Sequence, residues 1–251
     1  MAKAVGNMVM HLTVDDSKVT PTINTMKKQL RDLNATWRAN VEAAKVAGDS
    51  QTAAVAKVEG LTLALQKQKE IVEFSSQVLG NSVRQGTDES IRKYDALSTS
   101  VDRANAQYRN LNNQLESAQV VLDRESTGIV ELNKNIKASD ELTQAQIKSL
   151  KQQGDEFGAN ELKVQSLKDK QQSLNEVQEK EEKILSNVIA RSGEGSRAYI
   201  EQSVAVQKAK NAVAENTEEI GKYKQKINQT ENNLKELKSD YSSLKAFHGA
   251  N

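Results

Sequence analysis

A heptad pattern from Tyr94 to Ile136 constrains the fold of this chain more than any other feature. Alternating steps of three and four residues along this stretch give thirteen positions, and twelve of them are apolar or aromatic when Ala and Tyr are counted. The positions are Tyr94, Leu97, Val101, Ala104, Tyr108, Leu111, Leu115, Ala118, Leu122, Glu125, Ile129, Leu132 and Ile136. An isolated helix cannot bury so narrow a stripe. The pattern therefore predicts a partner helix whose side chains interlock along it.

A second stripe of the same period runs from Tyr199 to Leu244 and is interrupted only by Gln202, Asn216 and Thr230. Polar residues in such a seam often fix the register and the number of helices at some cost in stability. We therefore expect an all-α protein of long coiled-coil helices and antiparallel helical hairpins. Its function is expected to be mechanical or architectural, and not enzymatic.

Composition and charge agree with this expectation. The 251 residues carry 35 basic against 34 acidic side chains, so no net field draws the chain to nucleic acid or to an anionic membrane. Aromatic residues at 4% and a hydrophobic share of 37% argue against one large globular core, and the single Pro means that the commonest helix breaker is almost absent. The chain has no Cys, which excludes disulfides and thiolate chemistry. No apolar run approaches the roughly 18 residues of a membrane-spanning helix, and the first residues lack the apolar core of a secretory signal, so the cytosol is the default compartment.

The first segment differs from the rest of the chain. Apolar side chains alternate with others between Met8 and Val14, which predicts one short N-terminal β-strand that must pair with a strand from outside this chain. Thr20 and Pro21 then have the residue types of a helix N-cap and first helical position. We therefore expect residues 1–20 to form a strand and a linker.

Glycine-containing turns divide the remaining chain into helices. We expect a helix over 21–47 that ends at Gly48-Asp49-Ser50, a second over 51–84, and a third that begins near Asp88 and continues to Gln153-Gly154-Asp155. The heptad spacing carries through Ser126-Thr127-Gly128, so a kink is expected there. Turns that reverse the chain would give hairpins. Turns that stay helical would give one rod of at most roughly 370 Å. We favour hairpins for an isolated chain.

The chain also repeats itself. Gly48-Asp49 matches Gly154-Asp155 with an offset of 106 residues, and Tyr94 matches Tyr199 with an offset of 105. The lost residue falls in the glycine-rich turn 191–196, where a change of length costs little. The pattern predicts two copies of a three-helix unit, the first over residues 21–127 and the second over residues 128–251.

The sequence offers no site for chemistry, and we predict no catalytic, cofactor-binding or metal-binding residue. His11 and His248 lie far apart and belong to no ligand motif. The acidic cluster Glu179, Glu181 and Glu182 lies beside Lys180 and Lys183, which predicts solvated ion pairs. Three other features also favour structural roles. These are Asp15-Asp16 at a helix start, Gly193-Glu194-Gly195 without a phosphate-binding lysine, and Trp37 with Arg31 and Arg38 on the apolar stripe.

The opening residues resemble a known family. Residues 5–16, with the sequence VGNMVMHLTVDD, precede a helix that contains Leu30 to Asn40, with the sequence LRDLNATWRAN. Ala47-Gly48-Asp49 and the stretch from Ala56 to Leu61 follow. This arrangement is similar to the N-terminus of tail tape measure proteins from phages and prophages of Gram-positive bacteria. The similarity covers about the first 70 residues, and the rest is generic coiled coil.

The resemblance implies a structural protein of the virion tail, present in the host cytoplasm during assembly. Such a protein sets tail length inside the tail tube and leaves ahead of the DNA. Its implied partners are other copies of itself through the heptad seams, the tail tube and baseplate proteins, and a tail assembly chaperone. A ruler of this length is short for a long tail, so the resemblance also implies an N-terminal fragment or a truncated form.

Two other functions stay open. The first is a secreted helical-hairpin effector or a component of a pore-forming toxin, which would need apolar hairpin tips. The tips at residues 48–50 and 193–195 are polar, which disfavours it. The second is an intracellular scaffold.

Overall fold

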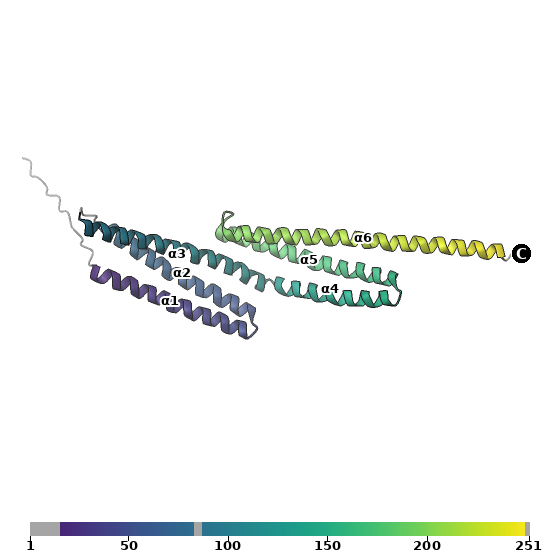
Figure 1. Ribbon diagram of the computed structural model, residues 1–251, viewed down its shortest axis with the longest axis horizontal. Coiled ribbons are helices and arrows are strands. Elements are labelled where there is room, and N and C mark those ends of the chain that lie inside the picture. The colour runs from purple at the N-terminus through teal and green to yellow at the C-terminus, as the bar shows by residue number, and fades with distance from the viewer. Residues whose placement is uncertain (1–15, 83–86, 249–251) are drawn as a thin grey trace, which may run out of the picture. The chain divides into compact units, whose positions relative to one another are not determined.

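The computed structural model describes residues 16–82 and 87–248, which form six helices (Figure 1). Helices contain 94% of these residues and none of them lies in a strand, so the all-α prediction is confirmed for this part of the chain. The predicted strand between Met8 and Val14 lies outside the described residues. The chain divides into two compact units between Leu122 and Asp123, five residues before the predicted start of the second repeat.

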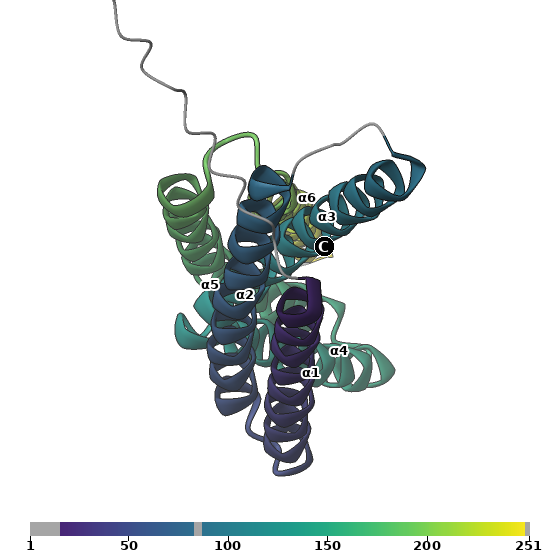
Figure 2. The same cartoon turned by 90° about the vertical axis from the view of Figure 1, so that its left-hand side faces the viewer.

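The first unit contains α1 (Asp16–Val46), α2 (Ser50–Asn81) and most of α3 (Asp88–Ser126). Helices α1 and α2 pack side by side along their length (Figure 2). Near the turn that joins them, Val41, Ala44 and Ala53 form a buried cluster, and Trp37 packs against it. Apolar positions spaced three and four residues apart thus place one face of each helix in the interface.

The start of α1 corrects one prediction. The helix begins at Asp16, so residues 16–20 are helical and not a linker, and Thr20 is not an N-cap. Pro21 lies inside the helix, where its missing N–H removes a hydrogen bond to the carbonyl four residues earlier. The preference of Pro for the first helical position is a tendency, and here the helix continues past it.

The second unit contains α4 (Ile129–Gln152), α5 (Glu156–Ser192) and α6 (Arg197–His248). Helix α5 packs against both α4 and α6 (Figure 1). Its core includes Leu167, Ile184 and Val188, all of which are almost completely buried. Helix α5 is therefore the central helix of this unit, with α4 and α6 as its two partners.

The expected kink at residues 126–128 is a complete break between α3 and α4. Gly128 has φ +76°, a left-handed conformation that L-residues with a side chain adopt only at a cost. Its N–H donates to the carbonyl of Glu125, which closes the last turn of α3. The apolar spacing carried no sign of this break, because the residues on either side of it resume the same period.

The two Gly-Asp turns have the same structure. Gly48 has φ +76° and Gly154 has φ +80°. In each turn the Asp carboxylate caps the next helix by accepting the backbone N–H three residues later, at 2.9 Å from Thr52 and at 2.7 Å from Gly158. In each turn the Asp N–H donates to the carbonyl five residues earlier. These contacts correspond one to one under the 106-residue offset found in the sequence.

Candidate functional site: the polar seam of the second unit

The residues that the sequence singled out for possible chemistry lie in separate places. His11 and Asp15 lie outside the described residues, and His248 is the last residue of α6. Gly193 and Gly195 lie in the turn between α5 and α6. Over residues 16–82 and 87–248, no three acidic or histidine side chains are grouped so that they could hold a metal ion.

Trp37 has the predicted structural role. It is partly buried against the core cluster of the first unit, and its indole N–H donates to Asn34 Oδ1 at 2.9 Å. The guanidinium carbon of Arg38 lies 5.4 Å from the ring centroid, within the range of a cation–π contact.

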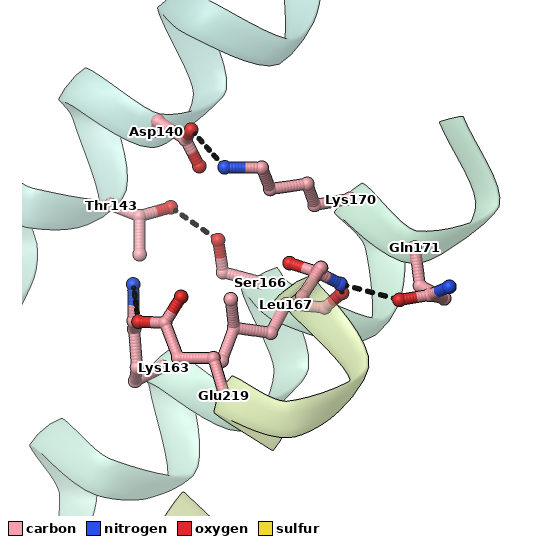
Figure 3. Close-up of polar contacts among 9 residues, drawn as sticks. Asp140, Thr143, Lys163, Ser166, Leu167, Lys170, Gln171 and Glu219 are labelled. Atoms are coloured by element: carbon pink, nitrogen blue, oxygen red, sulfur yellow. Dashed lines mark hydrogen bonds and ion pairs between the residues drawn. The ribbon is translucent and has the colours of Figure 1, made fainter. Parts of the chain in front are cut away.

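Polar side chains instead gather along α5, where it contacts α4 and α6. On the α4 side, Lys170 Nζ lies 2.6 Å from Asp140 Oδ2, and Ser166 Oγ donates to Thr143 Oγ1 at 3.1 Å (Figure 3). These four side chains point toward one another across the gap between the two helices. Asp140 pairs with Lys170 and Thr143 with Ser166, so the partner of the later α4 residue is the earlier α5 residue.

The α6 side of α5 carries a second set of contacts. Lys163 Nζ lies 3.0 Å from Glu219 Oε1 (Figure 3). The buried amide of Asn216 donates to the carbonyl of Leu167 at 2.8 Å and to Gln171 Oε1 at 2.7 Å. Asn216 was one of the polar interruptions found in the heptad seam, and it does lie between two helices.

Glu181 corrects the prediction that its acidic cluster is solvated. Its side chain is only 3% exposed and accepts a hydrogen bond from the guanidinium of Arg124. Gln202 Nε2 donates to Glu181 Oε2 at 2.6 Å and to the Glu181 carbonyl at 3.0 Å. Glu181 follows Val177 by four residues and precedes Ile184 by three, so its seam position was a signal that could have revealed its burial.

The neighbouring Glu182 fits the solvated interpretation. The ammonium of Lys210, 3.1 Å away on α6, and the amide of Gln178 lower the pKa of the Glu182 carboxyl below its ordinary value. The carboxylate faces solvent, so this ion pair is screened and weak.

Three charged side chains of α5 also contact the end of α3 and the break that follows it. Lys180 Nζ donates to the carbonyl of Thr127 at 2.7 Å, and Arg191 forms a 2.6 Å ion pair with Asp123. In the third contact the α5 residue is the anion, because Glu181 pairs with Arg124. These contacts hold the segment from Asp123 to Thr127 against α5.

Together these contacts define what the polar seam can do. The buried amide donors of Gln202 and Asn216 and the Glu181 carboxylate have their partners at one axial position, so sliding α6 along α5 by one turn would leave them unpaired. The seam therefore fixes register. It belongs to a class of all-α proteins in which polar groups specify how long helices align.

Comparisons with protein families, with curated proteins and with solved structures each gave no match. Among the described helices, none combines the length and the apolar character needed to cross a membrane.

Proposed function

We propose that the chain is a non-enzymatic structural protein of a phage tail, with the tape measure role of the family that its first 70 residues resemble. The observation that carries this proposal is the fixed register of long helices along the polar seam. An architectural protein needs defined lengths and alignments, and buried polar contacts supply them. The proposal includes coiled-coil packing in antiparallel hairpins, supported by the opposite order of paired residues on α5 and its neighbours.

The mechanism would be physical. A helix rises about 1.5 Å per residue, so residue number converts directly into length once the hairpins open into one rod inside the tail tube. Tail tube subunits would polymerise around the chain and contact its exposed charged faces, with the baseplate at one end and an assembly chaperone bound beforehand. The near balance of 35 basic and 34 acidic residues would favour release ahead of the DNA, because no net charge holds the chain to the tube.

The repeat offers a direct test of the ruler. Deleting residues 49–154 joins Gly48 to Asp155 and so regenerates one Gly-Asp turn with its capping carboxylate. Assembled with the tail tube protein of the same gene cluster, the full chain is expected to give tubes of uniform length. The deletion is expected to give uniform tubes that are shorter by up to about 160 Å, the rise of the removed residues.

Electron microscopy of the tubes would measure this difference. Tubes of unregulated length with both chains would contradict the ruler role. Neighbouring secretion genes in place of tail genes would favour the helical-hairpin effector.

A further inference from the structure

The C-terminal part of α6 carries an apolar stripe that no described residue covers. Leu234 is 48% exposed, Leu237 is 65% exposed and Tyr241 is 70% exposed. Every residue from 231 to 242 is exposed, whereas Val206 and Asn216, further back on α6, are buried against α5. We call residues 227–242 the open seam.

The open seam continues an interface that already exists. Its apolar positions follow Val206 and Asn216 at the same alternation of three and four residues, so they lie on the side of α6 that faces α5. Helix α5 begins at Glu156, only seven residues before Lys163, which contacts Glu219 and the ring of Tyr223 on α6. The apolar stripe on α6 thus extends beyond the end of α5 that begins at Glu156.

Two other seam positions of the second unit are covered by a neighbouring helix. Ile129 is 1% exposed in this unit, where α4 packs against α5, and Val206 on α6 is 7% exposed. Leu234 and Leu237 have the same apolar character but are open to solvent.

The charges and polar residues of the open seam indicate which helix fits it. In a parallel, in-register pair of α6 helices, Lys226 would face Glu231 of the second copy. The next flanking pair, Asn233 with Lys238, has no like charges. The parallel pair also sets the polar Thr230 against Thr230 of the second copy, whereas an antiparallel pair with Leu234 opposite Leu237 would set it against Tyr241.

We propose that the open seam is covered by the open seam of a second copy of this chain, as a short parallel two-stranded coiled coil. Each α6 would pack on its own α5 up to about residue 226 and on the partner's α6 beyond it. This deepens the architectural role proposed above by naming the surface through which copies join. It is tested on the purified chain alone, so either proposal can fail while the other stands.

Sedimentation equilibrium of the full chain tests the proposal. The pairing segment is short, so measurements should reach about 100 μM. The weight-average mass is expected to rise from 27.7 kDa toward twice that value with concentration. The double variant L234E/L237E is expected to stay at the monomer mass, because four buried carboxylates would replace the apolar contact.

The matched control is I200E, also on α6. Ile200 is 60% exposed but lies outside the open seam, so this variant should associate as the unchanged chain does. Far-UV circular dichroism would check that all three proteins are equally helical. A monomer at every concentration, or equal association of L234E/L237E, would overturn the proposal.

Orientation can be tested separately because the chain has no Cys. In a parallel pair the two residues at position 241 are adjacent, so Y241C should form an interchain disulfide under mild oxidation. In an antiparallel pair residue 241 would face residue 230, and the two Cys would lie about 16 Å apart. Association without this disulfide, together with cross-linking between T230C and Y241C chains, would refute the parallel arrangement.

Discussion

Gly60 lies at a close approach of α2 to Trp37 of α1, and replacing it by Ala tests the packing of the first unit. A Cβ added at Gly60 would lie 2.2 Å from Trp37 Cβ and 2.3 Å from Trp37 Cγ. Trp37 Cβ is fixed to the backbone of α1, so a change of rotamer cannot relieve the contact. Reaching an ordinary contact distance of 3.4 Å requires the helices to move apart locally by about 1.2 Å.

Two effects of opposite sign compete in G60A. Gly to Ala inside a helix stabilises by about 1 kcal/mol through backbone entropy and propensity. Overpacking of a tight contact costs about 1–3 kcal/mol, and here the clash includes Trp37 Cβ, which is bonded to the backbone, so the upper half of that range applies. We therefore expect G60A to destabilise the first unit by about 1–2 kcal/mol.

Position 221 supplies the matched control. A Cβ at Gly221 in α6 meets no atom within 4 Å, so G221A retains only the favourable term and should stabilise the second unit by up to about 1 kcal/mol. Trp37 is the single Trp, and its fluorescence during urea unfolding reports on the first unit, while far-UV circular dichroism follows both units. An unfolding midpoint for G60A at or above that of the unchanged chain would refute the reasoning.

Three further predictions concern polar contacts. N216L should leave the stability of the second unit unchanged or raise it by up to about 1 kcal/mol in urea unfolding. The reasons are that Asn216 Oδ1 is buried without a partner and that the matching residue of the first unit is Leu111. A loss above about 2 kcal/mol would contradict this. R124A should destabilise the second unit by about 2–3 kcal/mol, which is less than the roughly 3–5 kcal/mol for a fully buried pair because Arg124 is 39% exposed. R124L/E181L should recover much of the loss. The Thr52 hydroxyl and backbone N–H lower the pKa of Asp49. Its contribution to stability is therefore complete above the unfolded pKa of about 3.9 and is lost as pH falls through the lower folded pKa, so D49N should flatten the acid limb of the stability profile between about pH 5 and 2.

The sequence allowed much of the helical layout to be predicted. Helix α3 begins at Asp88 and α4 ends at Gln152, as the capping residues and the turn at residues 153–155 indicated. The turns were predictable because their signals are local, a glycine that adopts positive φ followed by a capping Asp. The start of α1 could not be predicted in this way. The preference of Thr20 and Pro21 for the first positions of a helix is weaker than the tendency of a formed helix to extend.

The polar seam was only partly predictable. Gln202 and Asn216 stood out as interruptions of an apolar stripe, and both are buried between helices. Glu181 was assigned to solvent together with its charged neighbours, although only Glu179 and Glu182 of that cluster face solvent. Spacing gives the side of a helix on which a residue lies, whereas burial of a charge also depends on a partner that is 57 residues away, Arg124.

The amino-acid sequence by itself determined the all-α class, the sites of the two Gly-Asp turns and the stripes that each helix must cover. These follow from contacts within a few residues, for which chain order and spatial neighbourhood coincide. Only the tertiary structure decided which stripes are covered, that α5 is the central helix of the second unit, and that the end of α6 stays open. Those outcomes depend on how far each helix extends past its partner, a property of pairs of helices that no single stretch contains.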